Sequence, residues 1–101
     1  MSDAEREAEE SEYRDLIQSM RNSGVFVAAE EVEHYDAART VRVRQGVVDV
    51  SNGPTARADE YVTGYFLIRV DAFEDAIHWA VQIPNARTGS VEVRPVMDID
   101  W

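Results

Sequence analysis

Three features of this sequence predict an α+β fold. Two segments have the apolar spacing of amphipathic helices, and five have the alternating or continuous apolar pattern of strands. Their order is helix, strand, hairpin, strand, helix, strand, which favours a sheet with helices on one face. The 101 residues have the length of one domain, so we expect a single domain over residues 1–101.

Both predicted helices begin with a capping pattern. An S-x-x-E box at Ser2 opens the first helix, residues 2–23, and a glycine follows its last turn. The same spacing recurs as D-x-x-E, so we expect Asp71 to cap the second helix together with Glu74. Pro84 is expected to end this helix, because proline cannot continue a helical hydrogen-bond pattern.

The predicted strands differ in how much of their surface is apolar. The residues 40–44 and 47–50 alternate around the turn signal Gln45-Gly46 and predict a β-hairpin. Residues 65–70 are nearly all apolar, which is typical of a central strand covered on at least one face. The first and last strands are expected at residues 25–29 and 90–94, and residues 85–89 are expected to form a loop.

Composition excludes several classes of partner. The formal net charge is −10, and nucleic acids and anionic membranes attract cationic surfaces, so we expect neither as a partner. No apolar run approaches the about 20 residues that a membrane helix requires, and the acidic N-terminus does not resemble a signal peptide. The absence of cysteine fits a reducing compartment, and we expect a cytoplasmic protein.

Several motifs resemble the YCII-related proteins, and within them the DGPF branch. The hairpin followed by Asn52-Gly53-Pro54 and the closing run Ser90-Val91-Glu92-Val93-Arg94-Pro95-Val96 carry the resemblance, which covers roughly residues 13–97. It implies a ferredoxin-like dimeric α+β barrel, with an inserted β-hairpin here, and therefore a homodimer. Most members of the family have no assigned reaction, and some relatives with a His and an acidic residue near the pocket look like lyases or isomerases.

The sequence departs from the family pattern in two places. The D-G-P-F signature reads Asn52-Gly53-Pro54-Thr55, and Arg57 and Asp59 stand where an acidic residue and a lysine often follow, while Glu60 still matches the second acid. A ferredoxin-like unit also needs a strand before its first helix. Residues 1–4 cannot supply this strand, so the first strand is expected to be missing from the chain.

Five residues are candidates for a functional site. By the resemblance, Asn52, Gly53 and Pro54 are candidate ligand-binding residues, although a turn preceding the proline is the simpler structural role. His34 and Glu60 are the candidate proton-transfer residues, since histidine exchanges protons near neutral pH; solvent-exposed loop positions would explain both equally.

Two further residues lie on the second predicted helix. His78 follows Glu74 by four residues, the spacing of a surface pair on a helix. Trp79 lies off the main apolar stripe of this helix, so it could belong to the core, to a dimer interface or to a pocket.

These residues lead to two hypotheses of function. The first is a homodimer that binds a small molecule, or another protein, without strong catalysis, because Asn52 cannot act as a general base. The alternative is a lyase- or isomerase-like enzyme that uses His34 and Glu60 for proton transfer. No spacing of metal ligands and no phosphate-binding glycine loop is present, so we expect neither a metal nor a cofactor.

Overall fold

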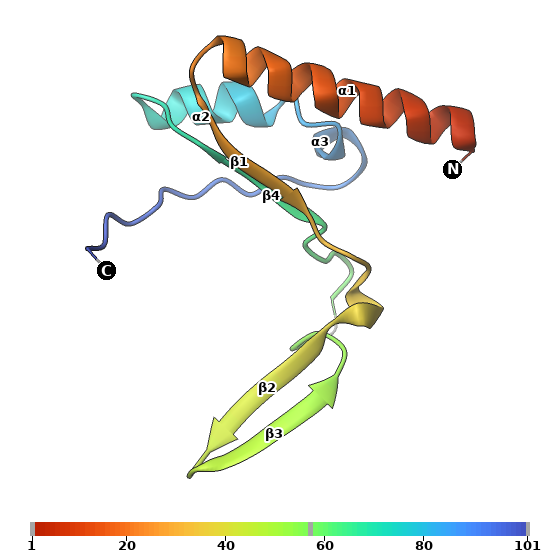
Figure 1. The fold of residues 1–101 in the computed structure, drawn as a ribbon, viewed down its shortest axis with the longest axis vertical. Coiled ribbons are helices and arrows are strands. Elements are labelled where there is room, and N and C mark those ends of the chain that lie inside the picture. Colours follow the sequence, from red (N-terminus) through yellow and green to blue (C-terminus); the bar gives the residue numbers. More distant parts are fainter. Residues whose placement is uncertain (1, 57, 101) are drawn as a thin grey trace. The chain divides into compact units, whose positions relative to one another are not determined.

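The computed structural model describes residues 2–56 and 58–100 and confirms the α+β class (Figure 1). The elements in chain order are α1 (Asp3–Asn22), β1 (Phe26–Glu31), the 3₁₀ turn η1 (Tyr35–Ala37), β2 (Arg39–Arg44), β3 (Val47–Asn52), β4 (Gly64–Ile68), α2 (Phe73–Ala80) and α3 (Asn85–Thr88). β1 pairs with β4, and β2 pairs with β3. The β2–β3 hairpin is therefore inserted in the sequence between two strands that pair with each other.

The described residues form two compact units. The first contains the chain up to Ala28 and again from Leu67 onward, and the second contains Ala29–Phe66. The α-helices belong to the first unit, and the hairpin belongs to the second. Among the described residues, no helix combines the length and the apolar character that crossing a membrane requires.

The ends of α1 match the sequence pattern closely. The Ser2 hydroxyl accepts a hydrogen bond from the Glu5 backbone N–H at 3.1 Å, and the same hydroxyl donates to the Glu5 carboxylate. At the other end Gly24 has a φ of 74°, its N–H donates to the Arg21 carbonyl, and the Val25 N–H donates to the Met20 carbonyl. This pair of bonds is the Schellman motif, which satisfies carbonyls that the helix leaves without partners.

The core of the first unit is small and is built around α1. Leu16 and Met20 of α1 are buried, as is Ile83 in the segment that follows α2. On the surface, the Arg87 guanidinium of α3 donates to both carboxylate oxygens of Glu12 at 3.0 and 2.8 Å. This hydrogen bonding raises the pKa of Arg87 and connects α3 to α1 across 75 positions of sequence.

Backbone hydrogen bonds show that β1 and β4 run antiparallel. The Arg69 N–H donates to the Val25 carbonyl at one end, and the Val32 N–H donates to the Thr63 carbonyl at the other, both at 2.8 Å. Gly64 stands where the strands approach closely, because a Cβ atom there would lie 2.7 Å from the Glu30 carbonyl oxygen. Only a residue without a side chain fits this position.

The expectation that residues 65–70 form a central strand is wrong, whereas the expected cover of one face is present in part, since Phe66 and Ile68 are half-buried. In the structure β4 ends at Ile68, its sheet has two strands, and the Tyr65 side chain is 53% exposed. In a ferredoxin-like sheet the neighbouring strand would be the one that precedes the first helix. The described residues contain no strand before α1, so β4 is paired on one edge by β1.

The predicted strand at residues 90–94 does not form either. This segment has no regular secondary structure, although Val91 and Val93 are half-buried while Glu92 and Arg94 are exposed. The Arg94 guanidinium contacts the Glu92 carboxylate, and this hydrogen bond raises the pKa of Arg94. The alternating burial is present, but a strand also needs a neighbour for its backbone groups.

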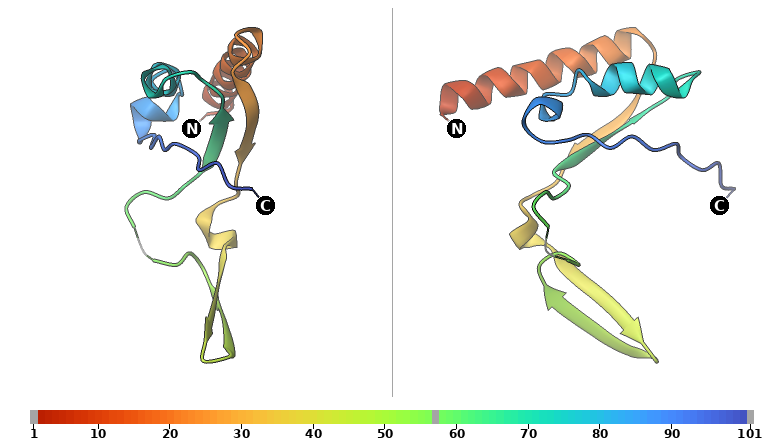
Figure 2. Two further views of the ribbon diagram at one scale, coloured as in Figure 1. Left: turned by 90° about the vertical axis from the view of Figure 1, so that its left-hand side faces the viewer. Right: turned by 180° about the vertical axis from the view of Figure 1, so that it is seen from behind.

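The hairpin forms as predicted (Figure 2). Its second strand, β3, extends to Asn52. Gln45 and Gly46 have φ values of 50° and 76°, and a two-residue turn with both φ angles positive matches the twist of the strands it joins. The register pairs Arg39 with Asn52 and Arg44 with Val47. The turn residues and the alternation of side chains along the two strands, both local features of the sequence, therefore determine this hairpin.

The start of α2 differs from the sequence-based expectation. The N-cap residue is Ala72, one position after Asp71, and no side chain caps the helix. The Asp75 N–H instead donates to the Ala72 carbonyl at 3.0 Å, so the Asp71–Glu74 box does not form. α2 ends at Ala80, and Pro84 begins the short helix α3 where a loop was expected at residues 85–89.

The uncapped start of α2 predicts that Ala72→Ser stabilises the protein. Ala72 already has the extended backbone conformation of an N-cap, so a serine hydroxyl can accept a free N–H of the first turn. We expect the free energy of unfolding to rise by about 1 kcal/mol, measured by urea denaturation. Asp71→Ala is the control and should change it by less than about 0.5 kcal/mol, the usual range for a surface substitution. A loss on Asp71→Ala near that of a true cap would contradict this helix start.

The close approach at Gly64 predicts that Gly64→Ala destabilises the protein. The new methyl group would clash with the Glu30 backbone rather than with a flexible side chain, so the strands would have to move apart. We expect a loss of about 1–3 kcal/mol, the usual cost of overpacking, in urea denaturation at fixed protein concentration. An unchanged or raised midpoint would show that β1 and β4 do not pair in this register.

Candidate functional site

A cavity of about 460 Å³ lies in the second unit, and we call it the His34 cavity. It is lined by Val32, Glu33, His34, Tyr35, Ala37, Ala38, Pro54, Tyr61 and Val62. These residues come from the end of β1, from η1, from the segment after β3 and from the segment before β4. The Val32–Thr63 backbone bond joins the first and last of these segments beside the cavity.

His34 occupies the N-terminal position of η1. Its Nδ1 atom accepts a hydrogen bond from the Asp36 backbone N–H at 3.3 Å and lies 3.2 Å from the Asp36 carboxylate. A neutral imidazole with an unprotonated Nδ1 can accept the hydrogen bond from the backbone N–H, and an imidazolium can donate its Nδ1–H to the carboxylate. Both groups are largely exposed, so the arrangement orients the His34 ring without removing it from solvent.

Aromatic rings form one wall of the His34 cavity. The rings of His34 and Tyr35 have centroids 4.1 Å apart, and those of Tyr35 and Tyr61 are stacked at 4.3 Å with an interplanar angle of 25°. The Tyr61 hydroxyl accepts a hydrogen bond from the Ala58 N–H at 3.0 Å. Tyr61 is therefore held at both ends, by ring stacking and by the loop that precedes it.

Of the candidate ligand-binding residues, Pro54 lines the His34 cavity. Asn52 is the last residue of β3, and Gly53 has a φ of 93° and makes two backbone contacts at the base of the hairpin. The Gly53 N–H donates to the Ala38 carbonyl, and its carbonyl accepts from the Thr40 hydroxyl, both at 2.8 Å. Asn52 and Gly53 thus shape the turn that carries Pro54 to the cavity. Arg57, which departs from the family pattern, lies outside the described residues.

The two residues proposed for proton transfer, His34 and Glu60, differ in their relation to the His34 cavity. His34 lines the cavity and makes its hydrogen bond within its own turn, to Asp36. Glu60 is adjacent to Tyr61 in sequence but is not among the lining residues. Sequence reasoning missed Tyr35 and Tyr61 as site residues; two tyrosines in otherwise polar loops were the available signal.

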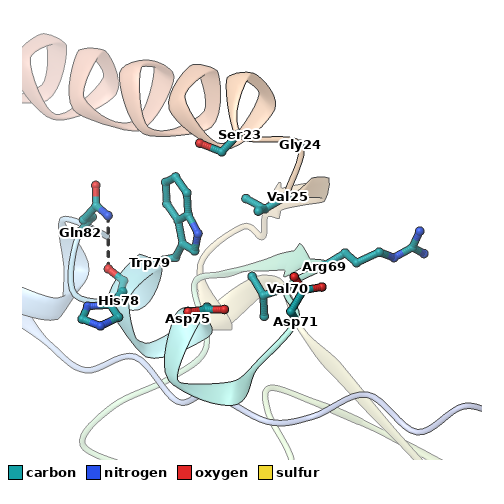
Figure 3. A pocket seen from close by; sticks show the side chains of 10 residues that line it. All are labelled: Ser23, Gly24, Val25, Arg69, Val70, Asp71, Asp75, His78, Trp79 and Gln82. Carbon is teal, nitrogen blue, oxygen red and sulfur yellow. Dashed lines mark hydrogen bonds between the residues drawn. The ribbon is translucent and has the colours of Figure 1, made fainter.

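A second cavity, of about 590 Å³, lies in the first unit, and we call it the Trp79 cavity (Figure 3). It is lined by Ser23, Gly24, Val25, Arg69, Val70, Asp71, Asp75, His78, Trp79 and Gln82. The half-buried Trp79 indole projects from α2 toward the end of α1, while the Arg69 side chain extends away from it (Figure 3). Trp79 and His78 both line this cavity.

The polar side chains that line the Trp79 cavity are exposed. The Gln82 side-chain amide donates to the His78 carbonyl at 3.2 Å, one helical turn back (Figure 3). Asp71 and Asp75 line the cavity and are exposed. Within residues 2–56 and 58–100, no three carboxylate or imidazole groups gather in the way that a metal ion requires.

Comparison with known sequences extends the similarity over nearly the whole chain. The family described as "YCII-related domain" matches residues 2–100. An uncharacterised protein of Rhizobium meliloti (strain 1021) is 32% identical over 96 residues, which cover 90% of this chain and 77% of that protein.

Proposed function

Because this chain belongs to the YCII-related family, we propose that it is a homodimeric domain that binds a small molecule in the His34 cavity without strong catalysis. The aromatic wall of this cavity is the observation that carries the proposal. Tyr35 and Tyr61 present stacked rings beside Pro54, within a volume in the usual range of small-molecule sites. Such a surface offers a preformed face for another flat ring.

The rest of the cavity lining supports a neutral or cationic aromatic ligand. Val32, Val62 and two alanines add apolar surface, and the carboxylate among the lining residues is that of Glu33. A carboxylate at the cavity and a net charge of −10 both disfavour anions. The ligand class that fits best is therefore a small ring without a negative charge.

Two features support binding in preference to catalysis. Asn52 carries an amide where the family signature has a carboxylate, and an amide cannot take up a proton at neutral pH. General acid–base catalysis also needs its proton carriers within reach of the same substrate. His34 lines the cavity, but Glu60 does not.

The small core supports the homodimer and the ferredoxin-like barrel as part of this proposal. Among the described residues, the buried hydrophobic side chains are Leu16, Met20 and Ile83. Domains near this size bury a modest fraction of their apolar surface alone and gain stability when a second copy covers more of it. The β1–β4 pair with an inserted hairpin is compatible with a ferredoxin-like sheet that lacks its first strand.

The proposal predicts that indole, used as a neutral aromatic probe, binds at the His34 cavity. In an NMR titration of the ¹⁵N-labelled protein, we expect the backbone amides of His34, Tyr35 and Val62 to shift. Tyr61→Ala removes half of the stacked wall, and the affinity should fall about threefold to tenfold, the scale of one aromatic contact. Tyr65→Ala is the matched control, because Tyr65 belongs to the same unit but does not line the cavity.

Two results would contradict binding at this cavity. One is the absence of indole-induced shifts at these amides in the wild-type protein. The other is an equal loss of affinity in the Tyr61→Ala and Tyr65→Ala variants, which would place the probe elsewhere. The amide spectrum of each variant shows whether the fold is retained.

The alternative, an enzyme that uses His34 and Glu60, predicts measurable turnover. We expect the wild-type protein to be inactive on a panel of lactones and of halogenated and enol substrates. Turnover that His34→Ala and Glu60→Gln each reduce by about a hundredfold or more would overturn the binding proposal, because a general acid or base contributes on that scale. His78→Ala is the control, since His78 lines the other cavity.

A further inference from the structure

The Trp79 cavity is a second candidate ligand site, separate from the His34 cavity. Its lining comes from the turn after α1, from the segment between β4 and α2, from α2 and from the turn after α2. All of these segments belong to the first compact unit. The volume of about 590 Å³ is in the usual range of small-molecule sites. One unit of the chain therefore supplies the whole lining of a cavity large enough for a small ligand.

Trp79 gives this cavity an aromatic wall. The indole is half-buried and projects from α2 toward the end of α1 (Figure 3). Val25 and Val70, which are also half-buried, add apolar surface to the lining. The face of an aromatic ring attracts cations, and among aromatic side chains the tryptophan ring does so best. The wall therefore suits a ligand that combines an apolar body with a positive charge.

The carboxylates of Asp71 and Asp75 give the cavity a negative charge. Both residues line it, and within the part of the chain that the structure describes neither forms an ion pair. The guanidinium among the lining residues is that of Arg69, and its side chain extends away from the Trp79 indole (Figure 3). The His78 imidazole lies on the opposite side of the indole from Asp71 in the same view. The chain's own cations thus leave these carboxylates open to a cation from a ligand.

We propose that the Trp79 cavity binds a small organic cation, namely an ammonium group on a short alkyl chain. In this arrangement the ammonium group contacts the indole face and the two carboxylates, and the alkyl chain contacts Val25 and Val70. An anion would be repelled by both carboxylates, and a neutral molecule would gain no attraction from them. The net charge of −10 adds a long-range attraction for cations. This ligand class differs from that of the His34 cavity, where stacked tyrosines suit a flat ring.

n-Butylammonium tests this site, with 1-butanol as the neutral molecule of similar size. In an NMR titration of the ¹⁵N-labelled protein at constant ionic strength, we expect butylammonium to shift the Trp79 indole N–H and the backbone amides of Gly24 and Asp71. Trp79→Phe identifies the indole signal, because the chain contains two tryptophans. Butylammonium should bind about tenfold more tightly than 1-butanol, the combined scale of a cation–π contact and surface ion pairs.

Two variants separate the carboxylate from the net charge of the chain. Asp75→Asn removes one carboxylate with little change in shape, and the affinity for butylammonium should fall about twofold to fivefold, the scale of a surface ion pair. Asp15→Asn is the matched control, because it removes the same charge from an exposed position on α1 that does not line the cavity. Its affinity for butylammonium should equal that of the wild type. The amide spectrum of each variant shows whether the fold is retained.

Three results would overturn the proposal. Equal binding of butylammonium and 1-butanol would show that the cavity does not recognise charge. An equal loss of affinity in Asp75→Asn and Asp15→Asn would show that the acidic chain attracts the cation without a site. The absence of butylammonium-induced shifts at the Trp79 indole would exclude binding at this wall. Butylammonium has no aromatic ring, so each of these results is independent of indole binding at the His34 cavity.

Discussion

The antiparallel pairing of β1 with β4 is the constraint on which both candidate sites depend. At one end of this ladder Val25 and Arg69 are joined by a backbone hydrogen bond, and both residues line the Trp79 cavity. At the other end the Val32 N–H bonds to the Thr63 carbonyl, and Val32 and Val62 line the His34 cavity. A shift of register by one residue would turn every side chain of these strands to the opposite face. The lining of each cavity would then change even if every helix remained intact.

Elements held by contacts between near neighbours were predictable from the sequence. The Ser2 cap, the glycine at the end of α1 and the Gln45-Gly46 turn each depend on a few adjacent residues. The start of α2 was misplaced by one residue. Asp71 and Ala72 both precede the apolar stripe of this helix, so the sequence pattern does not distinguish which of them is the N-cap. The backbone path after β4 decides it. The strand expected at residues 90–94 failed for a different reason. The buried and exposed residues of this segment do alternate. A strand also needs a neighbouring strand for its backbone hydrogen bonds, and the side-chain pattern does not show whether one is present.

The candidate site was predictable only in part, because contacts between distant parts of the sequence bring its residues together. His34 and Pro54 were singled out separately, and the structure brings them to one cavity. Their meeting depends on the turn at Gly53 and on the β1–β4 register, neither of which residue types alone specify. Tyr35 and Tyr61 were overlooked because 26 positions separate them in sequence and nothing local indicates that their rings stack. Glu60 was selected by its match to a family motif, and a motif match does not fix where a loop side chain points.

The position of the hairpin between two paired strands also affects how freely its length can change. β1 and β4 close a loop that contains the whole hairpin, and the entropy lost on closing a loop grows only with the logarithm of its length. Doubling such a loop costs on the order of 0.6 kcal/mol, which is less than one good cap contributes to a helix. Insertions or deletions at the Gln45-Gly46 turn would therefore leave the β1–β4 ladder almost unaffected. The hairpin is a place where related chains can diverge in length while the strands around it keep their register.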